Sequence, residues 1–288
     1  MKRLKPYLKL MRVSHYVKNL LVFVALACSG RLFVVEKFVS CLAAFVAFCM
    51  LSSVVYIVND IRDREKDRLH PVKCKRPIAA GTVSIAGAWA LAAGLLAVAV
   101  VCLLLTFHPA SLWLPALYLA LNLAYSFGLK DLPILDVAIL AAGFFLRVYY
   151  GALVTEIAIS RWLYLTVFVL AFYFALGKRR NELKRHGGET RRVLKAYTER
   201  FLDQHMGMCL TLANVFYALW SMDERTMAHY ENRSLFFTVP IVLLITMKYG
   251  LDIEKDSEGD PVDVLLHDKA LLALCVLYLA SMFAILYL

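Results

Sequence analysis

Charged residues are scarce in this chain, and long polar segments are missing. Asp, Glu, Lys and Arg make up 19% of the 288 residues, whereas hydrophobic residues make up 61%. Soluble globular proteins average about 25% charged and about 45–50% apolar residues. With a mean hydropathy of +0.66, one soluble core of this length would leave too much apolar surface in water. The composition therefore excludes an ordinary soluble enzyme and an intrinsically disordered chain, and it predicts a polytopic membrane protein.

Sequence features that define several other protein classes are also absent. The seven cysteines are scattered and form no CxxC pair, which argues against a disulfide framework and against a thiol metal or redox site. There is no Walker loop and no GxGxxG, so nothing indicates ATP-driven transport or dinucleotide binding. No polar segment is long enough for a domain of its own. We therefore expect residues 1–288 to form a single transmembrane domain with no soluble domain.

Nine apolar runs predict transmembrane α-helices, because a helix needs about 17–25 apolar residues to cross a bilayer. They cover approximately residues 18–35, 38–58, 85–107, 111–128, 134–154, 161–177, 206–220, 235–250 and 269–287. Most Lys and Arg residues fall in the N-terminal arm and in segments 59–84 and 178–205. The positive-inside rule places these segments and the N-terminus in the cytoplasm. The net charge of +10 then reflects topology, and no nucleic-acid partner is expected.

The second apolar run ends in a group of oxygen-bearing side chains. Asn59, Asp63 and Asp67 are spaced by four residues, so they would share one helix face, with Asp60 beside them. Amide and carboxylate oxygens suit Mg²⁺, which also keeps coordination positions for phosphate oxygens. We therefore expect Asn59, Asp63 and Asp67 to bind magnesium. The alternative is a solvated helix end whose acids pair with the interleaved basic residues.

Three motifs in this order resemble signatures of the UbiA superfamily of intramembrane prenyltransferases. They are similar to its first aspartate-rich motif, its Arg-Pro-Ile-x-x-Gly signature and its Tyr-Ser-x-x-Leu-Lys segment. In this chain they read Asn59-Asp60-x-x-Asp63-x-x-x-Asp67, Lys75-Arg76-Pro77-Ile78-Ala79-Ala80-Gly81 and Tyr125-Ser126-x-x-Leu129-Lys130. The resemblance implies an all-α bundle of nine transmembrane helices, with magnesium-dependent chemistry at the cytoplasmic face.

The segment after the sixth run departs from the pattern of the aromatic prenyltransferases. Where those enzymes carry a second aspartate-rich motif, this chain reads Gly177-Lys178-Arg179-Arg180-Asn181-Glu182. Such a cationic wall suits a ligand with further phosphate groups. The opening Arg12-x-x-His15-x-x-Lys18-Asn19, the stretch 143–151 and Leu176-Gly177-Lys178-Arg179-x-x-Glu182-Leu183 resemble the superfamily branch that transfers phosphoribose to polyprenyl phosphates.

The resemblance to that branch implies a reaction and a set of site residues. The donor would be phosphoribosyl diphosphate, the acceptor a polyprenyl phosphate such as decaprenyl phosphate, and the product a precursor for cell-wall arabinan. Asn59, Asp60, Asp63 and Asp67 would be catalytic. Substrate contacts are expected from Lys18, Tyr56, Lys73, Lys75, Arg76, Tyr125, Lys130, Arg147, Lys178, Arg179 and Glu182. For each lysine the alternative is an anchor that reaches lipid headgroups.

Arg147 is a separate case because it lies inside the fifth run. At 1.5 Å per residue it is roughly 20 Å from the cytoplasmic end, and an intramembrane arginine is a functional candidate by default. Three interpretations stay open: it orders the cavity, it reaches a phosphate in a deep pocket, or it extends outward toward Glu156.

Two rival functions and some properties of the assembly also stay open. One rival is an ordinary UbiA-type prenyltransferase with an aromatic or lipid acceptor, against which the missing second acidic motif counts. The other is a lipid-phosphate carrier, against which the lack of internal symmetry counts. The expected location is the bacterial inner membrane, in contact with the lipid bilayer, with the site facing the cytoplasm. Whether the chain forms a homo-oligomer cannot be read from the sequence.

Overall fold

The computed structural model describes residues 5–106, 108, 112–186, 191–224, 226, 233–254, 264–265 and 267–288. Throughout these ranges the regular elements are helices and no strand forms, which confirms the predicted all-α class. The chain groups into two compact units. The first unit comprises Met1–Leu26, Leu32–Phe127 and Leu146–Ile157, and the second comprises Ala27–Arg31, Gly128–Phe145 and Ala158–Leu288.

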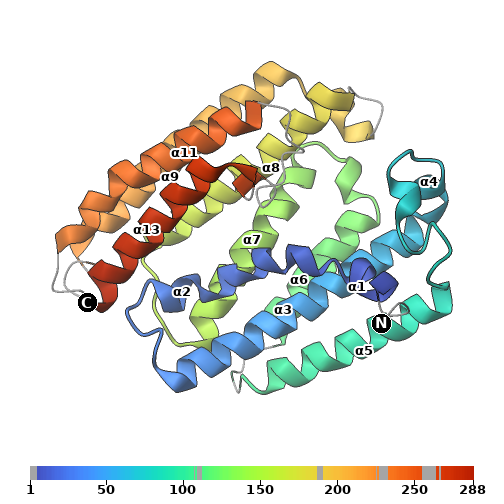
Figure 1. Ribbon diagram of the computed structural model, residues 1–288, viewed down its shortest axis with the longest axis horizontal. Helices are drawn as coiled ribbons and strands as arrows, with labels where there is room; N and C mark the ends of the chain where they lie inside the picture. The colour runs from blue at the N-terminus through green and yellow to red at the C-terminus, as the bar shows by residue number, and fades with distance from the viewer. Residues whose placement is uncertain are drawn as a thin grey trace. The chain divides into compact units, whose positions relative to one another are not determined.

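The first unit is built around one long helix, α3. Its elements are α1 (Lys5–Met11), η1 (Val13–Phe23), α2 (Val24–Ala27, whose last residue lies in the second unit), α3 (Val35–Arg62), α4 (Arg64–Arg68), η2 (Lys73–Lys75), α5 (Ile85–Leu104), α6 (Trp113–Ser126) and the second half of α7 (Leu135–Val154). α3 packs against α5, η1 and α6 (Figure 1). Buried apolar side chains around Phe48 and Tyr150, and around Ile57 and Ala88, join these helices.

The second unit is a set of long helices from the C-terminal half of the chain. Its elements are η4 (Leu129–Asp131), the first half of α7, α8 (Arg161–His186), η6 (Arg192–Ala196), α9 (Glu199–Met222), η7 (Arg233–Thr238), α11 (Val239–Glu254) and α13 (Lys269–Tyr287). α8 lies along α9, and α11 packs against α13 and α9 (Figure 1). The side chains of Thr198 and Asp268 cap α9 and α13 by accepting hydrogen bonds from backbone N–H groups.

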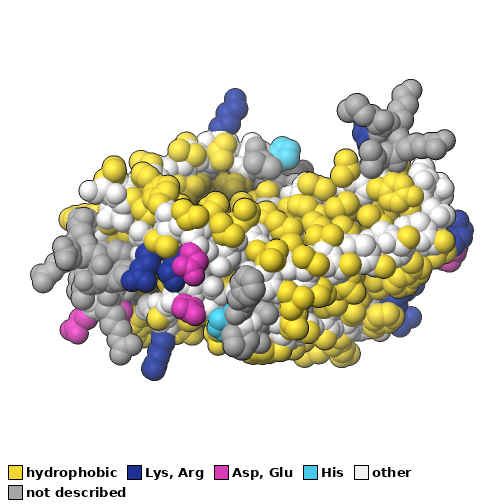
Figure 2. All heavy atoms as spheres, turned by 90° about the horizontal axis from the view of Figure 1, so that it is seen from below, with side chains coloured by type: hydrophobic (Ala, Val, Ile, Leu, Met, Phe, Trp, Pro, Cys, Tyr) yellow, Lys and Arg dark blue, Asp and Glu magenta, His cyan; other side chains and the backbone are white. Residues whose placement is uncertain are grey.

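Six of the described helices are long and apolar enough to cross a membrane, and a bent pair formed by α1 with η1 and α2 raises the number to seven. Two of the nine expected spans fall outside this set. α6 has only 14 residues, about 21 Å at 1.5 Å per residue, and α9 begins with the polar sequence Glu199-Arg200-Phe201-Leu202-Asp203. Apolar side chains cover most of the face drawn in Figure 2, as expected for helices in lipid. The chain is therefore a membrane-integral helical protein.

The first expected span differs from an α-helix. Residues 13–23 form a 3-10 helix of 11 residues, although 3-10 runs beyond about four residues are uncommon. Close packing against α7 accompanies this geometry, because a Cβ atom at Gly151 would lie 1.9 Å from the carbonyl oxygen of Val22. The Cys41 thiol of α3 donates to the same oxygen at 3.4 Å. Glycine at 151 thus allows η1 to approach the α7 backbone.

Candidate functional site

The acid-rich end of α3 bends at Asp63. α3 ends at Arg62 and α4 begins at Arg64, while Asp63 between them has φ −85° and ψ 4°. The N–H of Asp63 still donates to the carbonyl of Asn59 at 2.9 Å, and the N–H of Asp67 to the carbonyl of Asp63 at 2.8 Å. The predicted four-residue spacing is therefore kept across the bend. Asn59 and Asp63 are partly exposed, whereas Asp60 and Asp67 are buried.

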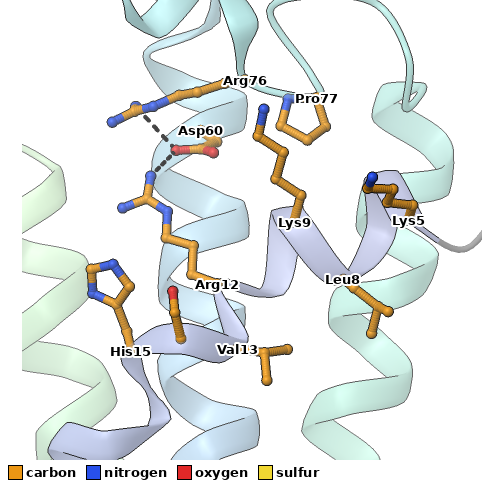
Figure 3. A pocket seen from close by; sticks show the side chains of 10 residues that line it. Lys5, Leu8, Lys9, Arg12, Val13, His15, Asp60, Arg76 and Pro77 are labelled. Carbon is orange, nitrogen blue, oxygen red and sulfur yellow. Dashed lines mark hydrogen bonds and ion pairs between the residues drawn. The ribbon is translucent and has the colours of Figure 1, made fainter. Parts of the chain in front are cut away.

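Two arginine side chains neutralise the two buried acids. Arg76 Nη1 lies 3.2 Å from Asp60 Oδ1 and 2.6 Å from Asp67 Oδ2. Arg12 Nη2 lies 2.7 Å from the same oxygen of Asp60, so both guanidinium groups converge on one carboxylate (Figure 3). The Arg12 guanidinium also stacks over Tyr56, 4.5 Å from the ring centroid. Burying a carboxylate is costly unless it is paired, so Arg12 and Arg76 stabilise this helix end.

The donor types at this helix end fit a magnesium ion only in part. Across the described ranges, no three His, Cys, Asp or Glu side chains gather closely enough to hold a metal ion. Mg²⁺ is commonly bound through one or two carboxylates and completes its coordination with water and substrate phosphates. The oxygen atoms of Asn59 and Asp63 meet that description. Asp67, which the sequence predicts as a third ligand, is held by Arg76 and fits the role of positioning that arginine.

A cavity of about 520 Å³ lies beside this group in the first unit. Its polar lining combines Lys5, Lys9 and Arg12 with His15, Asp60 and Arg76, so α1, η1, α3 and the segment after η2 all contribute (Figure 3). Lys5, Lys9 and Arg12 are not among the site residues predicted from the sequence. For Arg12 the sequence does contain a signal, because this residue opens the N-terminal motif that also contains His15.

Arg147 lies in a buried network of the first unit. Its Nε donates to Asn19 Oδ1 at 2.7 Å, and its Nη2 donates to the Tyr118 hydroxyl at 2.8 Å. The guanidinium lies 4.7 Å from the Tyr118 ring centroid, and Asn19 also donates to Ser52 Oγ at 3.3 Å. These contacts fit the interpretation that Arg147 orders its surroundings, which stays a prediction. The outward extension toward Glu156 is not adopted, since the guanidinium is directed at Asn19 and Tyr118.

Arg179 lies in a second buried network, in the second unit. Its side chain is fully buried, its Nε donates to Asp136 Oδ2 at 2.5 Å, and its Nη1 donates to Glu182 Oε2 at 2.7 Å. Glu182 also pairs with Arg191 at 3.3 Å. The predicted substrate contacts of Arg179 and Glu182 stay predictions, but their partners show that both residues hold this end of α8 in place.

Tyr197 completes the Arg179 network from the segment that follows η6. Its hydroxyl donates to Asp136 Oδ1 at 2.6 Å and accepts from the N–H of Ile134 at 2.6 Å. Burial raises the pKa of Tyr197 to about 12, so the phenol keeps the proton that it donates. Ile134 has a positive φ of 69°, an unusual conformation for a β-branched residue. The Tyr197 hydrogen bond stabilises that strained turn at the start of α7.

The remaining predicted site residues divide between the two units. Lys18, Tyr56, Lys73, Lys75, Arg76, Tyr125 and Arg147 belong to the first unit, and Lys130, Lys178, Arg179 and Glu182 to the second. The structure brings Tyr56, Asp60, Asp67 and Arg76 together. The backbone carbonyl of Lys75 joins them indirectly by accepting from Lys9 Nζ at 3.0 Å. Lys18, Lys73, Lys130 and Lys178 are partly exposed.

Comparison with known proteins shows which family this chain is related to. Residues 20–250 match the UbiA prenyltransferase family. The decaprenyl-phosphate phosphoribosyltransferase of Corynebacterium glutamicum is 33% identical over 277 residues, covering 93% of this chain and 83% of that protein. The enzyme of the same name from Mycolicibacterium smegmatis is 34% identical over 300 residues, covering 97% and 92%.

A solved structure shares the fold. The UbiA homolog from Archaeoglobus fulgidus bound to GPP and Mg²⁺ superposes with a TM-score of 0.72 and 19% sequence identity, covering 98% of this chain and 99% of that one. The family match over residues 20–250 and the identity of 33–34% with the two phosphoribosyltransferases show that the chain belongs to the UbiA prenyltransferase family.

Proposed function

We propose that this protein transfers 5-phosphoribose from phosphoribosyl diphosphate to a polyprenyl phosphate and releases diphosphate. The observation that carries the proposal is its identity of 33–34% with decaprenyl-phosphate phosphoribosyltransferases over nearly the whole chain. The proposal includes a single transmembrane domain of nine spans in the bacterial inner membrane. Its N-terminus and its site would face the cytoplasm, as the positive-inside rule predicts.

The bond that breaks is the one between C1 of the ribose and the diphosphate. Such bonds break through an oxocarbenium-like state, as in glycosyl transfer. A magnesium ion held by Asn59 and Asp63 would draw off the charge that builds on the leaving diphosphate. The protein's own cations act beside it: Arg76, oriented by Asp60 and Asp67, presents a fixed guanidinium at the same helix end. Preorganised hydrogen-bond donors of this kind stabilise the charge that develops in the transition state.

The nucleophile is a phosphate oxygen of the lipid, which is already ionised at neutral pH. No strong general base is therefore required of the protein. Attack from the face opposite the leaving group would invert C1 and give a β-linked lipid phosphoribose. Lys18 and Tyr56 are proposed to contact the donor, and Lys130 and Lys178 to bind a phosphate of the donor or the lipid.

The alternative is a UbiA-type prenyltransferase that uses a prenyl diphosphate. It draws support from the shared fold with a structure bound to GPP. Against it stands the segment 177–182, which has no second aspartate-rich motif. The one acid in that segment, Glu182, pairs with Arg179 and Arg191.

The test is a donor-choice assay on purified protein in vesicles that contain polyprenyl phosphate. One set receives Mg²⁺ and phosphoribosyl diphosphate, and the other receives Mg²⁺, a prenyl diphosphate and 4-hydroxybenzoate. We expect a phosphoribosylated lipid only in the first set. Asp63→Ala should abolish it, while Glu65→Ala, an exposed acid at the same helix end, should keep it. Product from the prenyl diphosphate alone would overturn the proposal.

A further inference from the structure

The cavity beside Asp60 is formed by a bend in the chain at Arg12. Arg12 adopts the left-handed conformation, with φ 54° and ψ 51°, and the axes of α1 and the following helix differ by 42°. Lys5, Leu8, Lys9 and Arg12 follow one another at helical spacing and all line the cavity. The bend thus brings one face of α1 close to Asp60 of α3 and to Arg76, which follows η2.

The side chains around the cavity carry a net positive charge. The guanidinium groups of Arg12 and Arg76 are met by the carboxylates of Asp60 and Asp67. The side chains of Lys5 and Lys9 are exposed, and the contact of Lys9 Nζ is to the neutral backbone carbonyl of Lys75 at 3.0 Å. Two ammonium charges therefore remain without a compensating carboxylate among the residues that line the cavity.

That excess matches one particular kind of anion. A phosphomonoester carries about −1.5 to −2 charges at pH 7, whereas a phosphodiester carries only one. The lining also includes the apolar side chains of Leu8, Val13 and Pro77, so the group attached to the phosphate would meet apolar surface. A cavity of about 520 Å³ is in the range of ordinary small-ligand sites.

We propose that the α1 cavity is a phosphomonoester site, in which Lys5 and Lys9 bind the terminal phosphate of a substrate. Arg12 and Arg76, fixed by Asp60, border the same site. This inference rests on the proposed function for the identity of the substrate, because both the donor, through its 5-phosphate, and the lipid acceptor carry a phosphomonoester. The binding chemistry itself depends only on the cavity.

Direct binding tests the site without any turnover. Full-length protein in detergent is titrated with inorganic phosphate, ribose 5-phosphate, geranyl phosphate and diethyl phosphate. We expect the three monoester-type anions to bind and the diester to bind at least about tenfold more weakly, because the diester carries one negative charge where a monoester carries about −1.5 to −2. The double variant Lys5→Gln/Lys9→Gln should weaken phosphate binding by about tenfold or more.

The matched control is Lys66→Gln, which removes one exposed ammonium from α4 in the same unit. It should bind phosphate like the unmodified protein. Equal phosphate affinity in the double variant and the unmodified protein would overturn the proposal. So would an equal loss in Lys66→Gln, because the effect would then be one of general surface charge.

Steady-state kinetics distinguishes the two sources of the phosphate. If the site holds the 5-phosphate, the double variant raises the KM for phosphoribosyl diphosphate and leaves that for polyprenyl phosphate unchanged. If the site binds the lipid phosphate, the double variant raises the KM for polyprenyl phosphate and leaves that for phosphoribosyl diphosphate unchanged. Unchanged values for both substrates would contradict a substrate role. If no transfer occurs at all, the proposed function fails, while the binding titration still decides whether the site exists.

Discussion

Arg147 in α7 connects three helices of the first unit, because its guanidinium donates hydrogen bonds to Asn19 in η1 and to Tyr118 in α6. Its guanidinium can donate in two directions within one plane, which a lysine ammonium on a flexible stem cannot reproduce. The side chain is 8% exposed, so a lost partner would not be replaced by bulk water. The network therefore contributes to the packing of η1, the element that carries His15 and Lys18.

Replacing Arg147 by lysine should lower stability, because at least one of these hydrogen bonds is lost inside the protein. We expect a loss of about 1–3 kcal/mol, visible as a lower thermal midpoint in detergent. Tyr118→Phe takes the hydroxyl away from one N–H group of the buried guanidinium and should also cost about 1–3 kcal/mol. An unchanged midpoint for Arg147→Lys would show that the network adds nothing to stability.

Asp268, the N-cap residue of α13, should make the stability of the protein depend on pH. The Lys248 ammonium at 2.6 Å and the N–H of Leu271 at 2.7 Å hold the pKa of Asp268 at about 2, below its ordinary 3.8. A lowered folded-state pKa contributes stability above the ordinary value, and this contribution is lost as the pH falls toward the folded value. The thermal midpoint of Asp268→Asn should therefore lie below that of the unmodified protein at neutral pH.

Comparing the thermal midpoints of the same two proteins at acid pH checks this prediction. As the pH falls from about 4 to about 2, the carboxyl of the unmodified protein takes up a proton and comes to resemble the amide. The difference between the two midpoints should shrink. A constant difference across this range would mean that the charge of Asp268 does not support the cap of α13.

At the scale of residues, the sequence predicts which side chains form the candidate site. It predicts less well which partners those side chains contact. The grouping of Asn59, Asp60, Asp63 and Asp67 follows from spacing alone, and these residues do lie at one helix end. Arg12 and Arg76 as partners of Asp60 lie 48 and 16 residues from it. Pairing over such separations depends on the tertiary packing of α1 and the segment after η2, which no local pattern contains.

At the level of elements, the contact between η1 and α7 depends on a single glycine. A Cβ atom at position 151 would meet the Val22 carbonyl oxygen at 1.9 Å and its carbon at 2.8 Å. Both are backbone atoms, so a rotamer change cannot relieve the overlap. The two helices would have to separate, and the buried cluster around Val22 and Tyr150 would open with them.

Gly151→Ala should consequently destabilise the protein by about 3 kcal/mol or more, the upper end of the cost of a forced core rearrangement. The measurement is the thermal midpoint together with the yield of folded protein in detergent. Gly94→Ala in α5 is the matched control, since a Cβ atom at that position would have nothing within 4 Å. That change should stabilise by about 0.5–1 kcal/mol, because alanine favours helix. Equal behaviour of the two variants would refute the close-approach argument.

The apolar runs predict the elements well where one helix carries the whole run. α3, α5, α7, α8 and α13 each contain most or all of the expected span. The first run is the exception, because residues 13–23 form a 3-10 helix, whose Val22 and Asn19 make tertiary contacts with Cys41 and Arg147. The periodicity of the sequence also fails to predict the break between α3 and α4 at Asp63, because backbone hydrogen bonds between residues four apart continue through it.

For the whole molecule, composition and charge pattern predict a helical membrane protein, and the family match confirms the predicted superfamily. The cationic segment 178–185 shows what a sequence pattern leaves out. Its composition predicts a wall facing phosphates, but Arg179 is buried against Asp136 and Glu182, and Arg180 pairs with Asp203 at 2.5 Å. Charge in a sequence does not reveal which residues have an internal partner.

The central claim is that the bond between ribose C1 and diphosphate breaks and that the ribose moves to the lipid. The most direct test uses phosphoribosyl diphosphate with one radiolabel in the ribose and a different one in the diphosphate. Purified protein in vesicles with polyprenyl phosphate and Mg²⁺ should move the ribose label into the lipid and release the diphosphate label into water, one for one. The diphosphate label in the lipid, or no label there from folded protein, would contradict this account.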